Sequence, residues 1–370
     1  MRAFKRKNTK PFSIFTVVSL CLFLVTVIIV EIAKASPAFA DYFNDTVAHF
    51  FRFIMARLGG LFPFSIYEVI MLSIPFFVSL IVFLAIRKFK SGEGRLRFCF
   101  NIVSVVLLFI AGHNIALGVA YNTTTVEKKM ELSEVEVTEE RLAEILCSLR
   151  DEINILSEEI NYTEDGVSVP NLTFRQISDL LVESYGKLNE KYGFPKNFYS
   201  YAKRVHFGNL MSYLGITGIY TYYTGDANVN SAYPPYDITF TTAHELAHQR
   251  GILRENEANF MAYLVTSSSD NPFLRYSGAL NMYLYIGSAL RRTNNELYQE
   301  ISSSLCDKAK SDINASYSVT RKYGDTIIAD ISNLVNDLFL KSNGTAGVVT
   351  YGRVVTLTVM YYESVKTEVK

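Results

Sequence analysis

The sequence has no excess charge of either sign, few cysteines and no internal repeat. Lysine plus arginine and aspartate plus glutamate number 36 each among the 370 residues, so no overall field attracts nucleic acid or another polyanion. The four cysteines are far apart in the sequence, which excludes a metal site built from closely spaced cysteine pairs. The five histidines are therefore the first residues to consider as metal ligands.

Each cysteine has a simple structural interpretation, with one alternative. Cys21 and Cys99 lie in apolar runs, where a thiol behaves as a small hydrophobic group. Cys147 and Cys306 lie in the polar part of the chain. They could form a disulfide if that part is outside the cytoplasm, or they could remain free thiols.

Two of the five histidines lie four residues apart, with a glutamate directly after the first. On a helix, His244 and His248 share one face and can both turn a ring nitrogen toward one ion. Glu245 can then reach a water molecule beside the ion, as a general base. This HExxH pattern predicts a zinc site, although such a pattern also occurs by chance on a solvated helix.

A catalytic zinc normally has three protein ligands, so a third must come from elsewhere. Gly251 can end the helix because glycine adopts the left-handed conformation easily, and the chain can then turn and start a second helix. Glu255 and Glu257 follow. We prefer Glu255, since Asn259 lies one helical turn beyond it and could orient a ligand histidine, whereas Glu257 has Met261 at that position.

Long uncharged apolar runs dominate the N-terminal part and predict membrane helices. We expect a membrane anchor over residues 1–121, with spans at about 11–32, 66–87 and 98–120, and a second domain over residues 122–370. The first run could instead be a cleavable signal peptide, because Ala38-Phe39-Ala40 resembles a cleavage site. Its length and the spans that follow favour a retained anchor. We interpret residues 31–64 as an amphipathic segment and a turn at the outer surface.

The basic clusters predict the orientation in the membrane. Lysines and arginines flank the first span within residues 1–10 and join the second span to the third within residues 87–97. Both clusters should lie in the cytoplasm, which places the domain after residue 122 on the outer side. We therefore expect a multi-pass protein of the cell membrane with an extracytoplasmic candidate site.

The region after residue 122 predicts a mainly α-helical domain with a small sheet. Thr138 can cap a helix whose apolar residues keep helical spacing, and a second helix is expected from about Phe174 to Tyr192. Residues 211–223 suggest short strands, followed by a turn at 224–228. Such a strand could pair with an extended peptide along its edge, or could be an ordinary core hairpin.

Three further features have a structural interpretation. His206 has no ligand partner at a useful spacing. Residues 294–310 predict one helix, and residues 348–365 are apolar but too short, and interrupted by Arg353, for a fourth span.

The chain resembles the bacterial family known as domain of unknown function 3810. The resemblance rests on residues 63–66, 224–230, 244–260, 275–277, 336–344 and 351–355. It implies a membrane-anchored, zincin-like (α+β) zinc metallopeptidase without an established substrate. The Glu-x-x-Ala-Asn piece is also similar to that of zincin-like peptidases related to phage-repressor-cleaving enzymes. There the first glutamate binds the metal, which implies Glu255 as the ligand here. In the broader glutamate-zincin group an aspartate usually stands in place of Asn259.

A hydrolytic site also needs a hydrogen-bond donor for the oxyanion that develops on the substrate. Tyr351 and Arg353 could provide it. The alternative is that Tyr351 packs in the core and Arg353 pairs with an acidic residue.

We hypothesise a zinc-dependent peptidase in which His244, His248 and Glu255 hold Zn²⁺ and Glu245 is the general base. Its partners would be the lipid bilayer and a peptide or protein substrate. The competing hypothesis is a non-catalytic zincin-like module that binds a partner at the membrane surface. An intramembrane protease is disfavoured, because the motif lies in polar surroundings between Asp237 and Arg254.

Overall fold

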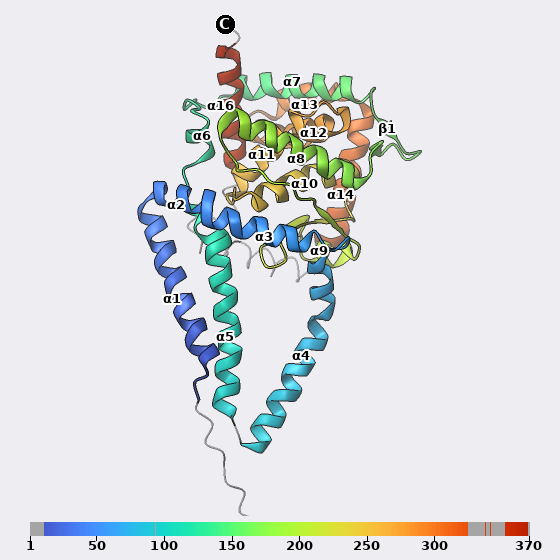
Figure 1. Cartoon of the computed structure of the whole chain (residues 1–370). Helices are drawn as coiled ribbons and strands as arrows, with labels where there is room; N and C mark the ends of the chain where they lie inside the picture. Colours follow the sequence, from blue (N-terminus) through green and yellow to red (C-terminus); the bar gives the residue numbers. More distant parts are fainter. Residues whose placement is uncertain (1–10, 93, 325–336, 338–340, 342–351, 369–370) are drawn as a thin grey trace, which may run out of the picture.

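Three long apolar helices form the N-terminal part of the protein. The computed structural model describes residues 11–92, 94–324, 337, 341 and 352–368 (Figure 1). The helices are α1 (Ile14–Ala35), α4 (Ile66–Ser91) and α5 (Arg95–His113), and α5 continues through a π-helical turn (Asn114–Gly118) and a 3₁₀ turn (Ala120–Asn122). Each of the stretches Ile14–Ala35, Ile66–Ser91 and Arg95–Asn122 is long and apolar enough to cross a membrane. The three expected spans are thus present as helices, with ends within a few residues of the predicted ones.

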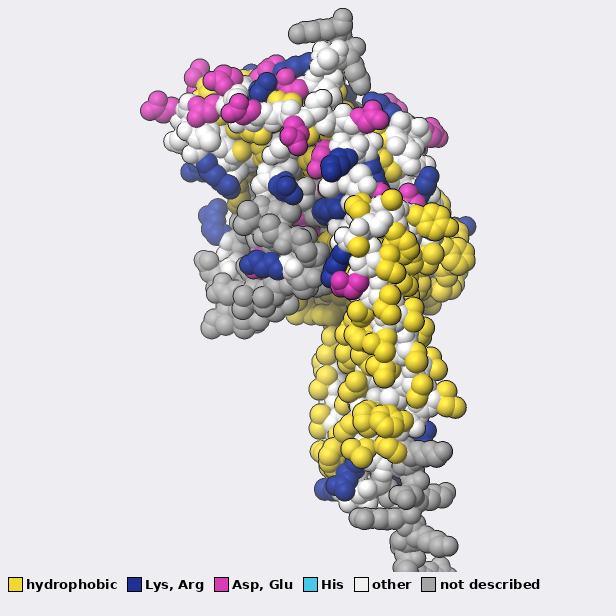
Figure 2. Space-filling model, turned by 90° about the vertical axis from the view of Figure 1, so that its left-hand side faces the viewer, with side chains coloured by type: hydrophobic (Ala, Val, Ile, Leu, Met, Phe, Trp, Pro, Cys, Tyr) yellow, Lys and Arg dark blue, Asp and Glu magenta, His cyan; other side chains and the backbone are white. Residues whose placement is uncertain are grey.

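The side chains of these helices form an apolar column below a larger, mixed surface (Figure 2). Dark blue lysine and arginine side chains gather at the far end of the column, and magenta acidic side chains gather on the upper part of the molecule. α1 packs along α5, whereas α4 diverges from both (Figure 1).

A short helical segment lies across the upper ends of these helices. It consists of α2 (Pro37–Phe43), a π-helical turn (Asn44–Ala48) and α3 (His49–Gly59). Phe50, Ile54 and Leu58 recur every four residues on α3 and are exposed on one face, as expected for a helix that lies at a membrane surface. On the other face Arg52 is fully buried and donates hydrogen bonds to the carbonyl of Ala116 at 2.8 Å and that of Asn44 at 3.0 Å.

The remainder of the described chain is mainly helical. Its helices are α6 (Val126–Lys129), α7 (Glu139–Leu156), α8 (Phe174–Tyr192), α9 (Gly208–Tyr213), α10 (Pro235–Gln249), α11 (Glu255–Ser267), α12 (Pro272–Thr293), α13 (Asn295–Ser303), α14 (Asp307–Gly324) and α16 (Arg353–Glu368). α12 packs against α7, α10 and α11, and this arrangement forms the main core. α10 and α11 are buried over most of their length, so the side chains between them are held on two sides.

Local sequence signals explain where several helices begin. The hydroxyl of Thr138 accepts a hydrogen bond from the backbone of Arg141 and caps α7, as predicted. α8 has the expected bounds, and Thr173 and Gln176 form a capping box at its start. The apolar residues predicted for the α7 core from Leu142 to Leu156 are buried.

A three-stranded sheet lies between the helical core and the segment formed by α3 and the start of α4. Its order is β3 (Lys203–Val205), β5 (Asp226–Asn230), β4 (Gly218–Thr221). β3 is parallel to β5, with Lys203 opposite Asn228, and β4 is antiparallel to β5, with Gly218 opposite Val229. A separate hairpin pairs β1 (Asn161–Tyr162) with β2 (Ser168–Val169). The small sheet expected from the sequence is therefore present.

Several sequence-based bounds were wrong. Residues 211–213 belong to helix α9 rather than to a strand, and residues 226–228 form the start of β5 rather than a turn. The helix expected over residues 294–310 is broken between α13 and α14.

In α16 Val354, Val355 and Leu357 are buried in the main core, which explains the apolar character of this segment. Cys147 and Cys306 are both free thiols, so the alternative without a disulfide holds in the structure.

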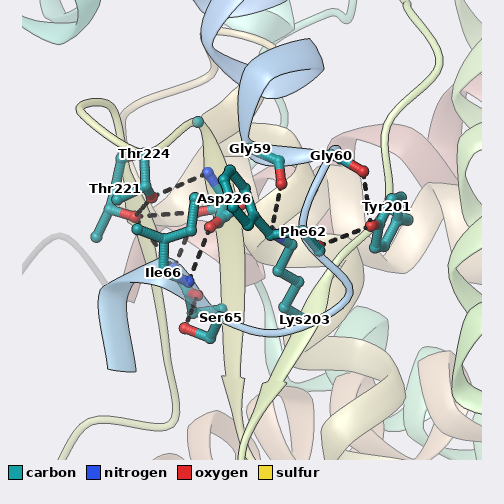
Figure 3. Close-up of polar contacts among 12 residues, drawn as sticks. Gly59, Gly60, Phe62, Ser65, Ile66, Tyr201, Lys203, Thr221, Thr224 and Asp226 are labelled. Atoms are coloured by element: carbon teal, nitrogen blue, oxygen red, sulfur yellow. Dashed lines mark hydrogen bonds and ion pairs between the residues drawn. The ribbon is translucent and has the colours of Figure 1, made fainter. Parts of the chain in front are cut away.

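Polar side chains join the sheet to the turn between α3 and α4 (Figure 3). Lys203 and Asp226 form an ion pair of 2.8 Å in which each side chain is 2% exposed. The Lys203 ammonium also donates to the carbonyl of Gly59 at 2.7 Å, and Asp226 accepts a hydrogen bond from the backbone of Ile66. Next to them Ser65 donates to Asn228 at 2.6 Å. The sheet is thereby attached to the first residues of the second apolar helix.

Candidate metal centre

Helix α10 carries both histidines of the HExxH pattern on one face. The helix ends after Gln249, and Gly251 follows with a φ of +89°. Its amide donates to the carbonyl of His248 at 3.0 Å, while the amide of Ile252 donates to that of Ala247 at 3.0 Å. A Cβ atom at residue 251 would lie 2.5 Å from the Arg52 guanidinium, so this turn favours glycine both by its conformation and by its space.

The turn reverses the chain and brings the start of α11 in front of the two histidines. An Oε atom of Glu255 lies 3.3 Å from Nε2 of His244, and the other lies 3.6 Å from Nε2 of His248. One potential ligand atom from each of the three residues can be chosen so that all lie within 4.8 Å of one another. Among the described residues this is the one cluster of three or more histidine, cysteine or acidic side chains with that geometry.

The second nitrogen of each histidine is held by a hydrogen bond. Nδ1 of His244 lies 2.9 Å from Oδ1 of Asn259, and Nδ1 of His248 lies 2.8 Å from the carbonyl oxygen of Ile252. A carbonyl oxygen can only accept, so Nδ1 of His248 carries a proton and its Nε2 is available as a ligand. The Asn259 oxygen likewise leaves Nε2 of His244 available as a ligand. Asn259 therefore lies where the sequence predicted it, next to a ligand histidine.

Glu257 lies in a different environment from Glu255. Its Oε1 accepts a hydrogen bond from Arg254 at 2.7 Å and another from the backbone of Val126 at 3.2 Å. The carboxylate is buried, 3% exposed, and thus already has a cationic partner and a backbone donor. In this conformation Glu257 joins α11 to the segment that follows the third apolar helix, and it is not part of the histidine cluster.

Glu245 lies under strand β4. The backbone amide of Tyr220 is within hydrogen-bonding reach of its carboxylate. A Cβ atom on Gly218 would lie 2.6 Å from Oε1 of Glu245, so the absence of a side chain there makes room for the carboxylate. Glu245 is 4% exposed, and its Oε2 has no hydrogen-bond partner in the described part of the protein. A buried carboxylate oxygen without a donor is costly, which points to an additional group at this position.

Burial and mutual attraction shift the pKa values of the cluster. Burial raises the pKa of Glu245. Burial alone would lower the pKa of His248, but the facing Glu255 carboxylate outweighs it and raises this pKa to about 9. Burial alone would raise the pKa of Glu255, yet the two histidines hold this pKa well below its usual range. The cluster without metal therefore retains a proton between Glu255 and a histidine, and a bound cation would displace it.

A polar cavity of about 200 Å³ opens beside the cluster. It is lined by Thr217, Asp237, Phe240, Thr241, His244, Glu255, Asn259, Asn281 and Tyr285. Asp237, Thr241, Asn281 and Tyr285 line this cavity, although the sequence did not predict them as site residues. The signal for the first two was spacing, because Asp237 and Thr241 precede His244 by seven and three residues on the same helical face. Asn281 and Tyr285 come from α12, and no local pattern connects them with the motif.

The two suggested oxyanion donors do not both fall within the described residues. Tyr351 lies outside them. Arg353 is exposed and lines a separate cavity together with Arg254 and Glu257, away from the one that contains His244 and Glu255. His206 is also exposed, as expected for a residue without a ligand role.

Comparison with known families agrees with the resemblance seen in the sequence. The family described as protein of unknown function (DUF3810) matches residues 39–359. The match covers most of the chain, and the protein belongs to this family. No curated protein and no solved structure matches the chain.

Proposed function

We propose that this protein is a membrane-bound, zinc-dependent peptidase. The observation that carries the proposal is the convergence of His244, His248 and Glu255, with Nε2 to carboxylate distances of 3.3 and 3.6 Å. Two imidazole nitrogens and one carboxylate oxygen are a set of protein ligands found in catalytic zinc sites.

The residues around the cluster support zinc as the group that they hold. Both Nδ1 atoms are hydrogen-bonded to oxygen atoms, which turns the two Nε2 atoms toward one point between α10 and α11. Three protein ligands leave a position for water or substrate, as in catalytic rather than structural zinc sites. Bound zinc would supply Lewis acidity, which polarises a carbonyl oxygen and lowers the pKa of water to about 7.

Glu245 would be the general base. The water that attacks the carbonyl carbon loses a proton to Glu245 as the new C–O bond forms. When the C–N bond breaks, Glu245 returns that proton to the leaving nitrogen, which departs as an amine. Burial raises the pKa of this carboxyl, which suits a group that must both accept and release a proton near neutral pH.

The edge of β4 supports a peptide as the substrate. The carbonyl of Thr217 accepts a hydrogen bond from the amide of Asn230, so alternation along an antiparallel pair turns the backbone groups of Gly218 and Tyr220 away from β5. Among the described strands β4 has β5 as its neighbour on one side alone. At Gly218, the partly exposed end of β4, an extended chain bound along the other side would pass directly beside Glu245.

The distribution of basic residues supports an extracytoplasmic site. Lys88 and Lys90 lie in the last turn of α4, and Arg95 begins α5. Figure 2 shows basic side chains at this far end of the apolar column. Positive charges favour the cytoplasmic side, so we place the domain with the candidate centre on the other side of the membrane. Labelling of single cysteines introduced near residues 90 and 307 in intact cells would test this orientation, and labelling of the first alone would refute it.

The metal is tested by elemental analysis of the purified full-length protein in detergent. Wild type should contain one zinc per chain. Glu255→Gln and His248→Ala should weaken binding by more than the roughly 10–100-fold that loss of a supporting residue costs. Glu257→Gln is the matched control and should retain zinc. Zinc that survives Glu255→Gln but not Glu257→Gln would overturn the ligand assignment.

Catalysis is tested with Glu245→Gln in the same preparation. We expect normal zinc content and a loss of about 10²–10⁴-fold in hydrolysis of a randomised peptide mixture, followed by mass spectrometry. Zinc binding with no hydrolysis by wild type above the Glu245→Gln level would instead support the non-catalytic module.

A further inference from the structure

The candidate centre is attached to the membrane segment through the helix that supplies Glu255. Arg254, the residue before it, donates hydrogen bonds to the carbonyl of Tyr121 at 3.0 Å and to that of Thr123. Leu253 packs with Leu117 and Tyr121 at the end of the third apolar stretch. The loop between the ligand histidines and Glu255 therefore rests on the upper end of that stretch.

Strand β4 attaches the other side of the centre to the same stretch. β4 begins at Gly218, next to Glu245, and is followed by Tyr222, whose hydroxyl donates to the carbonyl of Phe109 at 2.6 Å. Phe109 lies 14 residues beyond Arg95, about 20 Å along the helix at 1.5 Å per residue. A hydrocarbon layer is about 30 Å thick, so Tyr222 reaches the depth of its outer third.

Exposed apolar side chains mark the same level on neighbouring elements. Phe50, Ile54 and Leu58 form the exposed face of α3. Phe207, just before α9, and Leu210, on α9, are also exposed. Together with the depth that Tyr222 reaches, these residues place the surface of the bilayer at the height of α3, which lies across the upper ends of the apolar helices (Figure 1).

The polar contacts below the sheet hold this arrangement in place. Lys203 and Asp226 are both buried and connect β3 and β5 to Gly59 and Ile66 (Figure 3). Since Ile66 begins a membrane helix, the sheet has a defined height above the bilayer. Four residues of β4 at about 3.3 Å each span roughly 13 Å between Glu245 and the segment that enters the membrane.

We infer that the substrates are membrane-anchored polypeptides, cleaved at a peptide bond a few residues outside the bilayer. This inference rests on the proposed peptidase function and adds a class of substrate to it. Gly218, at the partly exposed end of β4, lies beside Glu245, roughly 13 Å along the strand from the segment that contacts Phe109. A substrate whose own anchor lies in the same bilayer would cover that distance as an extended chain, with its cleaved bond about four to eight residues from its anchor.

The test uses the full-length protein, loaded with zinc, in lipid nanodiscs. The probes are synthetic peptides with one apolar transmembrane helix followed by a randomised segment of about twenty residues on the catalytic side. A second series has a Gly-Ser spacer of ten residues between the helix and the same segment. A third series has the randomised segment without the helix. Cleavage sites and rates are measured by mass spectrometry, with Glu245→Gln as the background.

The expected result is cleavage of the first series at a set distance from the helix. In the second series the cuts should move into the spacer, or the rate of cleavage should fall at least tenfold. The third series should be cleaved at least tenfold more slowly than the first. Sharing a bilayer raises the rate for any membrane enzyme, so the position of the cut is the deciding readout.

The possible failures are distinguishable. The peptidase proposal stands and the inference is wrong if wild type cleaves all three series equally. The same conclusion follows if the cuts in the second series stay within the randomised segment, at the same rate, and so lie farther from the helix. If wild type cleaves none of them above the Glu245→Gln background, the peptidase proposal fails, and the inference fails with it.

Discussion

The ion pair between Lys203 and Asp226 allows a quantitative test of how the sheet is attached to the turn between α3 and the second apolar helix, α4. Asp226→Asn retains the size of the side chain and removes its charge. The Lys203 ammonium, 2% exposed, would then have the Gly59 carbonyl and an amide oxygen as partners and no anion. Removal of one member of a buried pair costs about 3–5 kcal/mol.

The expected change is large enough to measure in two ways. For a domain of this size about 1 kcal/mol corresponds to roughly 2–4 °C, so the melting temperature of the detergent-solubilised protein should fall by about 6–20 °C. Hydrogen exchange of the β5 amides should report the same loss in opening free energy. The double variant Lys203→Met/Asp226→Asn removes both charges and should recover most of this loss.

Two results would refute this reasoning. A loss below about 1 kcal/mol in Asp226→Asn would mean that the pair is solvated rather than buried. A double variant as unstable as the single one would mean that the polar contacts themselves, and not an uncompensated charge, stabilise the junction.

Three further predictions concern the candidate centre and its cavity. Gly218→Ala should displace Glu245 and reduce hydrolysis at least tenfold with unchanged zinc content, because the new Cβ would lie 2.6 Å from Oε1; equal activity would contradict the close approach. Asn259→Ala should weaken zinc binding about 10–100-fold, measured by chelator competition, since His244 loses its orienting oxygen; no change would exclude that role. Burial raises the pKa of Asp237 to about 6, so the folded state holds this proton more tightly than the unfolded chain. The resulting stability is fully present below about pH 4 and is lost, by at most about 3 kcal/mol, as the pH rises through 6. Denaturant titrations of Asp237→Asn at pH 4 and 7 should lack this difference, and an unchanged pH dependence would refute the assignment.

The sequence identified elements whose signals are local. The apolar runs predicted three long helices because a membrane span requires about twenty consecutive apolar residues, and the structure has helices at all three places. Thr138 and Thr173 marked helix starts through side-chain caps. The bounds of β5 and α9 were not predictable in this way, because a strand of five residues and a helix of six depend on their tertiary partners more than on their own pattern.

Within the candidate centre, too, local spacing predicts some features, and long-range contacts decide the others. The spacing of His244 and His248 alone determines that they share a face of α10, because helical geometry is local. The position of Glu255 depends on how α11 folds back after Gly251, and the exclusion of Glu257 depends on its contacts with Arg254 and Val126. The contact with Val126 joins residues 131 positions apart, and no spacing rule in the sequence contains it.

The sequence by itself determined the apolar spans, the helical character of the second half and the pair of histidines, since each follows from periodicity or composition. Only the tertiary structure decided how the sheet is attached to the apolar helices and that Gly218 of β4 lies against Glu245. The attachment depends on Tyr222 reaching Phe109 and on Lys203 reaching Asp226 and Gly59. Such long-range contacts form because burying a polar group requires a partner, and the fold, rather than the neighbouring sequence, supplies that partner.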